Sequence, residues 1–147
     1  MTDSASGGEL LLLDTHVWIW AALGEDAKVE RRIPGLITAA AQAGRVRLSA
    51  VSLWEAGGAM SRGRVPIRGT VDDWMREAIA AFGGVVRPVD RATALASLAL
   101  PGLEHGDPGD RLLIATARLM GARLATADRH ILAYGAQGHV DVLDVRP

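Results

Sequence analysis

The chain has 147 residues, of which 49% are hydrophobic, 22% are charged and 4% are aromatic. This balance is typical of a globular domain and excludes a fibrous or low-complexity protein. The 16 basic residues nearly cancel the 17 acidic ones and leave a net charge of -1, so the overall charge lacks the basic excess that marks many nucleic-acid binders. A chain of this length buries about 70% of its unfolded surface, so it can form a core without a disulfide or a structural metal.

The absence of cysteine restricts the possible chemistry. It excludes disulfides, thiolate zinc sites, iron–sulfur clusters and a cysteine nucleophile, so any metal must be bound by oxygen or imidazole. It also fits a reducing compartment. No apolar run approaches the roughly 20 residues that a membrane span needs, and residues 1–9 carry no basic signal-peptide start. We therefore expect a cytoplasmic protein without a membrane segment.

Residues 1–8 are small and polar, and we expect them to be flexible, with residues 9–147 forming a single domain. Short apolar runs predict five strands, at residues 9–14, 46–50, 85–89, 123–126 and 140–145. Helical patterns with capping residues lie between them, at residues 15–23, 27–43 with an interruption near Pro34, 52–62, 70–82, 90–100, 107–121 and 129–134. Ser52 and Glu55 have the spacing of a capping box, which would begin the third of these helices at Ser52.

Strands and helices alternate along the whole chain, and no linker divides it. This order predicts an α/β domain with three layers, in which helices cover both faces of a parallel sheet of about five strands.

Four acidic residues fall at comparable places in the predicted fold. Asp14 ends the first strand, Glu55 lies on the helix after the second, Asp110 lies in the first turn of a helix, and Asp128 follows the strand at residues 123–126. Open parallel sheets bind ligands at the carboxyl ends of their strands. We therefore expect the four carboxylates to converge on one pocket, with Asp107 one helical turn from Asp110.

Several carboxylates in one pocket repel each other, since two unit charges 4 Å apart cost about 4 kcal/mol at an effective dielectric constant near 20. A divalent cation relieves that repulsion, and an all-oxygen ligand set favours Mg²⁺ or Mn²⁺. The reaction that this chemistry predicts is metal-assisted hydrolysis of a phosphodiester. Each acid also has a structural interpretation as a helix cap or a first-turn residue, and the two roles are compatible.

Four sequence segments that carry these acids resemble the motifs of a known family. They are Leu11-Leu-Leu-Asp-Thr-His-Val-Trp18, Ser49-Ala-Val-Ser-Leu-Trp-Glu55, His105-Gly-Asp-Pro-Gly-Asp-Arg-Leu-Leu-Ile-Ala115 and Thr126-Ala-Asp128. In order and spacing they resemble the PIN-domain ribonuclease toxins of toxin–antitoxin operons, the VapC type. The resemblance covers nearly the whole chain.

The resemblance implies a three-layer PIN fold and a Mg²⁺ site formed by Asp14, Glu55, Asp110 and Asp128, with Asp107 supporting it from outside. Mn²⁺ is expected to substitute. It also implies endonucleolytic cleavage of RNA by a metal-activated water, a homodimer, and a cognate antitoxin through which the pair binds operator DNA.

The chain departs from the family pattern in two places. The helix after the Trp-Glu motif carries Gly57 and Gly58 and lacks the lysine common in relatives. Each glycine costs about 1 kcal/mol against alanine in a helix, so this helix is predicted to be loose or closely packed. Gly109 stands where relatives often have a large aromatic residue.

Arginines near the motifs are candidates for RNA contacts, with Arg111 the strongest and solvated surface arginines the alternative. The candidates are Arg62, Arg64, Arg68, Arg111 and Arg129.

The tryptophans lie on apolar helices, so we predict core or interface roles for them rather than base stacking; they are Trp18, Trp20, Trp54 and Trp74. No pair of histidines has the spacing of a helical zinc site, and His105, near the acids, is assigned no catalytic role.

Other classes of protein fit less well. A phosphoacceptor domain needs a lysine near its acyl phosphate, and the only lysine, Lys28, lies after the first helix. A haloacid-dehalogenase-like phosphatase needs a second aspartate where His16 stands, and a dinucleotide-binding domain needs a Gly-x-Gly-x-x-Gly turn that is absent. The main alternative is a catalytically weak PIN-like module that acts with an antitoxin in operator regulation.

Overall fold

The computed structural model describes residues 8–103 and 106–147. Its centre is a five-stranded sheet with the order β3-β2-β1-β4-β5, and every strand pair is parallel. The strands are β1 (Leu11–Leu13), β2 (Val46–Ser49), β3 (Val86–Arg87), β4 (Arg123–Thr126) and β5 (Val142–Asp144). The predicted parallel sheet is therefore confirmed, although its outer strands are shorter than the apolar runs suggest.

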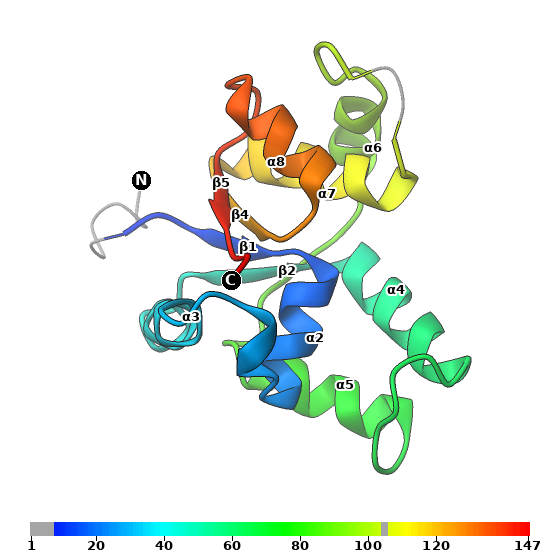
Figure 1. The fold of residues 1–147 in the computed structure, drawn as a ribbon. Helices are drawn as coiled ribbons and strands as arrows, with labels where there is room; N and C mark the ends of the chain where they lie inside the picture. The colour runs from blue at the N-terminus through cyan, green and yellow to red at the C-terminus, as the bar shows by residue number, and fades with distance from the viewer. Residues whose placement is uncertain (1–7, 104–105) are drawn as a thin grey trace.

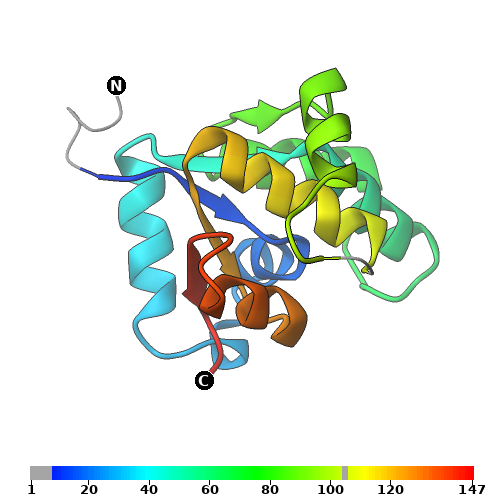
Figure 2. The same cartoon turned by 90° about the horizontal axis from the view of Figure 1, so that it is seen from above.

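Helices connect the strands and cover both faces of the sheet (Figures 1 and 2). They are α2 (Thr15–Leu23), η1 (Asp26–Lys28), α3 (Ile33–Gln42), α4 (Ala50–Ser61), α5 (Val71–Ala80), α6 (Arg91–Leu98), α7 (Pro108–Met120) and α8 (Arg129–Ala136). In Figure 1, α2, α3 and α5 lie on one side of the sheet, and α6, α7 and α8 lie on the other. Within residues 8–103 and 106–147, no helix is long and apolar enough to cross a membrane.

The central strand β1 divides the core into two clusters. Leu11 and Leu13 pack with residues of α2, α3 and α5, whereas Leu12 packs with residues of α7 and α8. Because successive side chains of a strand point to opposite faces, this alternation builds a core on each side of the sheet. Buried on both faces, β1 has the continuous apolar sequence expected of an internal parallel strand. The three-layer α/β/α prediction is confirmed.

Two local predictions are wrong. Pro34 does not interrupt a long helix but lies in the first turn of α3, where proline is tolerated because no intrahelical bond needs its missing N–H. The third predicted helix begins at Ala50 rather than after Ser52, and its N-cap is Ser49, whose hydroxyl accepts from the Val51 N–H at 3.1 Å. The prediction of a flexible segment concerns residues 1–8, of which residues 1–7 lie outside the described residues.

Truncating Leu12 to alanine should destabilise the fold strongly, because its side chain is completely buried in the central strand. We expect a loss of about 2–5 kcal/mol in the free energy of unfolding, measured by urea denaturation. Leu36→Ala is the matched control, since Leu36 is 50% exposed. Equal losses for the two variants would contradict the central position of β1.

Candidate active site

All five acids of the predicted site line one cavity of about 910 Å³: Asp14, Glu55, Asp107, Asp110 and Asp128. The sheet order explains why they meet. β1 lies between β2 and β4, so the chain leaves β1 toward one side of the sheet and later returns to the other. Ligands of open parallel sheets bind where the strand order reverses in this way. The cavity lies at the carboxyl ends of these central strands.

Asp14 follows β1, and both of its carboxylate oxygens accept hydrogen bonds. Oδ1 accepts from the Thr15 N–H at 2.7 Å and thereby caps α2, while Oδ2 accepts from the Thr126 hydroxyl at 2.7 Å. Burial raises the pKa of Asp14, and these two hydrogen bonds partly oppose that rise. Asp14 is therefore a helix cap and a cavity residue at once.

Thr126 connects Asp14 to Asp128. Its fully buried hydroxyl donates to Asp14 and accepts from the Asp128 N–H at 3.0 Å. Asp128 in turn caps α8, because its Oδ1 accepts from the N–H groups of His130 and Ile131 at 2.8 and 3.1 Å. One threonine thus sets the positions of two aspartates that come from neighbouring strands.

Glu55 does not form the predicted capping box with Ser52. Its Oε1 instead accepts from the hydroxyl of Thr15 at 2.6 Å, and the Ser52 hydroxyl, 2.8 Å from that of Thr15, can donate to it. The capping-box prediction is wrong because the helix starts earlier, at the Ser49 cap. This places Ser52 inside the helix, facing α2, and leaves the Glu55 carboxylate on the cavity wall.

Gly109 provides room for that carboxylate. A Cβ atom at this position would overlap Glu55 Oε2 and lie 3.0 Å from Asp107 Oδ1. A residue with a side chain at position 109 is therefore incompatible with this position of Glu55.

The first turn of α7 carries the other two acids. Asp107 Oδ1 accepts from the N–H groups of Gly109 and Asp110 at 2.8 and 3.2 Å, so Asp107 caps the helix. The pKa of Asp110 is raised to about 7, first by burial and then by the negative charges of Asp128, Asp14, Asp107 and Glu55. The acids are close enough that they oppose each other's ionisation.

The donor set fits a hard divalent cation. Among residues 8–103 and 106–147, no group of three or more acidic or histidine side chains is arranged so that it could hold a metal ion by itself. Mg²⁺ does not require one, because it keeps several waters and is held by one or two carboxylates together with substrate phosphates. A cation here would also relieve the repulsion that raises the pKa of Asp110.

Two of the five candidate arginines, Arg62 and Arg64, line the cavity. Arg68 and Arg129 are exposed but are not among the lining residues. Arg111 was the strongest candidate from sequence, and its position does not support that rank. Its guanidinium donates to the carbonyls of Ser97 at 2.9 Å and Leu103 at 2.7 Å, which ties α7 to α6 and to the segment that follows it.

The tryptophans divide into two groups. Trp18 is fully buried, donates through Nε1 to the Ala78 carbonyl at 3.1 Å and packs on Trp74 with ring centroids 5.1 Å apart. Trp20 is half-buried, whereas Trp54 is 79% exposed and lines the cavity, so of the predicted core or interface roles the core role does not hold for Trp54. The helix periodicity contained this signal, since Trp54 lies opposite the buried positions 52, 56 and 60.

His16 also lines the cavity and packs against Trp20 with ring centroids 6.0 Å apart. Sequence patterns did not select it, because its place after Asp14 gives no spacing signal for a ligand. His105 lies outside the described residues.

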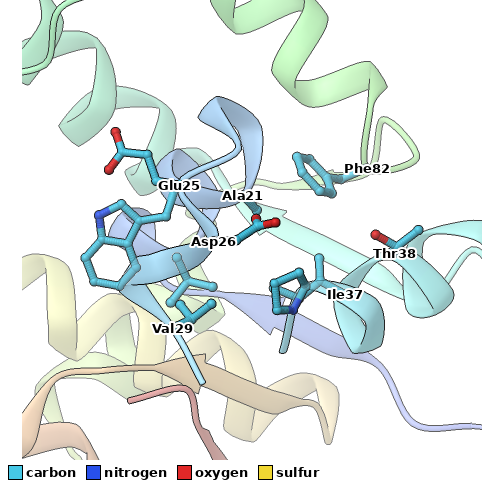
Figure 3. Close-up of a pocket in the computed structure, with 10 residues that line it drawn as sticks. Ala21, Glu25, Asp26, Val29, Ile37, Thr38 and Phe82 are labelled. Carbon is cyan, nitrogen blue, oxygen red and sulfur yellow. The ribbon is translucent and has the colours of Figure 1, made fainter. Parts of the chain in front are cut away.

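A second, smaller cavity of about 170 Å³ lies between α2, η1 and α3 and is lined by residues such as Trp20, Val29 and Phe82 (Figure 3). Small-molecule sites usually occupy about 300–1,000 Å³, so this cavity is below the usual size. A further cavity of about 540 Å³ lies beside the end of α7 and the loop before β5, but among the described residues only one acid, Asp141, lines it. The carboxylate cavity is therefore the one that gathers the acids.

Comparison with known proteins identifies the family. Residues 11–136 match the PIN domain family. Ribonuclease VapC22 of Mycobacterium tuberculosis (strain ATCC 25618 / H37Rv) is 31% identical over 125 residues, which cover 84% of this chain and 91% of that protein. The resemblance inferred from the four motifs is confirmed.

Solved structures share the fold. VapBC2 from Rickettsia felis, bound to a DNA fragment from its promoter, superposes with a TM-score of 0.69 at 13% identity and covers 92% of this chain and 98% of its own. FitAcB from Neisseria gonorrhoeae gives a TM-score of 0.65 at 20% identity, with 92% and 97% coverage. At these identities the likeness establishes the architecture alone.

Replacing Thr126 with valine removes the hydroxyl that holds Asp14 and Asp128 while keeping the side-chain shape. We expect a loss of about 1–3 kcal/mol in unfolding free energy, because a buried carboxylate and a backbone N–H lose a partner. Thr126→Ser should restore most of it. Thr116→Val is the matched control, since the buried Thr116 hydroxyl donates only to the Leu112 carbonyl of its own helix. Equal losses in urea denaturation would contradict the role of Thr126.

The raised pKa of Asp110 predicts that the stability of the folded protein depends on pH. The folded protein keeps a proton that the unfolded chain releases, so the stability of the metal-free protein should fall between about pH 4 and about pH 7. Asp110→Asn should therefore be more stable than wild type at pH 8 in EDTA, by about 1–2 kcal/mol after allowance for solvent screening. The difference should disappear near pH 4. The same difference in unfolding free energy at both pH values would contradict the raised pKa of Asp110. An equal stabilisation by the exposed Asp73→Asn control at pH 8 would also contradict it.

Proposed function

The chain belongs to the PIN-domain family, and from that premise we propose that it is the toxin of a toxin–antitoxin pair. Its proposed activity is that of an endoribonuclease that hydrolyses RNA phosphodiester bonds with Mg²⁺, for which Mn²⁺ can substitute. The observation that carries the proposal is the single cavity in which five carboxylates meet at the reversal of strand order. The similarity to Ribonuclease VapC22 supports RNA as the substrate class.

Asp14, Glu55, Asp110 and Asp128 are the residues that would hold the cation. When bound, the metal supplies an activated water and neutralises charge on the scissile phosphate. Asp110 must release its proton to serve as a ligand, and its pKa of about 7 makes that release possible near neutral pH. Asp107 acts indirectly, because it fixes the first turn of α7 on which Asp110 lies.

Buried hydroxyls orient the acids before any substrate arrives. Thr126 holds Asp14 and Asp128, and Thr15 holds Glu55. Preorganised ligands lower the cost of assembling the reactive geometry. Thr15 and Thr126 are positioning residues in this proposal.

Arg62 and Arg64 are the proposed phosphate contacts, since they line a cavity that is otherwise strongly acidic. They would offset its repulsion of an RNA backbone and make binding sensitive to salt. Arg68 and Arg129 could contact RNA only beyond the cavity. Arg111 contributes by holding α7 against α6.

The proposed partners are a second copy of the chain, a cognate antitoxin, and operator DNA reached through that antitoxin, in the cytoplasm. The structural neighbours described above include toxin–antitoxin complexes, one of them on promoter DNA, which supports this assignment.

Cleavage of total RNA by the purified protein tests the proposal directly. We expect fragments with Mg²⁺ or Mn²⁺ and none with EDTA. Asp110→Asn and Asp14→Asn should lower the rate by at least roughly 100-fold, because even outer-shell changes cost 10–100-fold at metal sites. The exposed Asp73→Asn variant should cleave as wild type does.

Undiminished cleavage in EDTA would contradict the metal dependence, and undiminished cleavage by folded Asp110→Asn would contradict the ligand assignment. A folded wild type that cleaves no RNA with either metal would favour the alternative of a binding module.

A further inference from the structure

Trp54 is the most exposed large apolar side chain in the part of the chain that the structure describes, at 79%. It precedes Glu55 on α4 and lines the carboxylate cavity. The helix buries its other face through Ser52, Ala56 and Met60, so folding does not account for an indole at this position. An aromatic side chain typically buries 150–250 Å² of its surface in a folded protein, whereas most of the Trp54 surface remains exposed.

Gly58 and Arg62 continue a line that starts at Trp54. The three residues are spaced four apart, so they follow each other along one side of α4, and all three line the cavity. A Cβ atom on Gly58 would lie 3.2 Å from Arg62 Nη1, which shows that the guanidinium lies against the helix at this glycine. Trp54 and Arg62 are about 12 Å apart along the helix axis.

We propose that this line, Trp54–Gly58–Arg62, is a binding track for single-stranded RNA, in which an unpaired base stacks on Trp54 and a phosphate contacts Arg62. The inference rests on the proposed nuclease function and adds a base-binding subsite to it. Unpaired bases of RNA stack on exposed aromatic rings and on guanidinium planes. The cavity of about 910 Å³ has room for such a ligand beside the acids.

The surroundings favour RNA over a protein partner at this position. Protein interfaces have cores depleted of charged residues and need a contiguous apolar patch. Trp54 instead shares its cavity with charged side chains, among them Glu55, Arg62 and Arg64. An aromatic ring and a cation along one helix, in the same cavity as the proposed metal ligands, match a short stretch of single-stranded RNA, which offers both bases and phosphates.

The first test measures binding of a short mixed-sequence single-stranded RNA and of a matched oligonucleotide with abasic sites. It uses the Asp110→Asn background with Mg²⁺, in which the RNA stays intact. Trp54→Ala should weaken binding of the normal RNA by roughly 5- to 150-fold, the range for loss of one stacked base, and leave abasic binding unchanged. Trp54→Phe should retain most of the affinity. Leu98→Ala, which truncates a 76% exposed side chain outside the cavity, should have no effect.

The two neighbouring glycines provide the second test. Gly58→Ala should raise the melting temperature, because alanine favours a helix, yet weaken RNA binding by displacing Arg62. Gly57→Ala is the matched control: a Cβ atom there would lie 3.4 Å from Met75 Cε, an ordinary contact, so it should raise stability without changing RNA binding. Arg62→Ala should reduce the salt dependence of binding by about one phosphate, whereas Trp54→Ala should not.

Equal affinities of the Asp110→Asn parent and its Trp54→Ala variant for the normal RNA would contradict base stacking on Trp54. An equal loss of affinity for the normal and the abasic oligonucleotide would also contradict it. A change of oligomeric state in Trp54→Ala with RNA binding unchanged would also overturn it, in favour of a protein contact. If the folded parent binds neither oligonucleotide and wild type cleaves no RNA, both the proposed function and base stacking on Trp54 are wrong. If wild type cleaves RNA but Trp54→Ala binds it with unaltered affinity, only base stacking on Trp54 is wrong.

Discussion

The repulsion among carboxylates at one end of the sheet is the constraint on which the rest of the site depends. The central position of β1 brings acids from four segments into one cavity. The pKa of Asp110 is raised to about 7 because burial and the neighbouring carboxylates disfavour its ionised form. The fold opposes that cost with oriented dipoles. Asp14, Asp107 and Asp128 cap α2, α7 and α8, so three helix N-termini with their partial positive charges face the same cavity. A bound cation would complete this compensation.

At these aspartates, the capping role is compatible with the proposed binding of a cation. An N-cap aspartate uses one oxygen for backbone N–H groups, as Asp107 and Asp128 do through Oδ1, while the side chain still lines the cavity. Helix caps hold the carboxylates rigidly because the cap geometry fixes the side-chain torsions. Caps of this kind explain how short strands can position a cluster of carboxylates.

Much of this arrangement could be predicted from the sequence because it follows from local patterns. The apolar run before Asp14, the Asp-Pro start of α7 and the Thr126–Asp128 turn each specify an element and its cap. What the sequence did not predict has both local and tertiary causes. The capping box at Ser52 failed because a second serine, Ser49, caps the helix one turn earlier. The carbonyl partners of Arg111, in Ser97 and Leu103, could not be predicted, because they lie outside its own helix.

Two glycines, Gly58 and Gly109, have a common physical role at the site. Gly109 leaves space that the Glu55 carboxylate fills, and Gly58 leaves space against which the Arg62 guanidinium lies. Neither has a backbone conformation that requires glycine, because neither has a positive φ. A helical glycine costs about 1 kcal/mol relative to alanine, and at both positions the space that it leaves is occupied by an acidic or basic side chain of the cavity wall. The two missing side chains therefore determine where the Glu55 carboxylate and the Arg62 guanidinium lie.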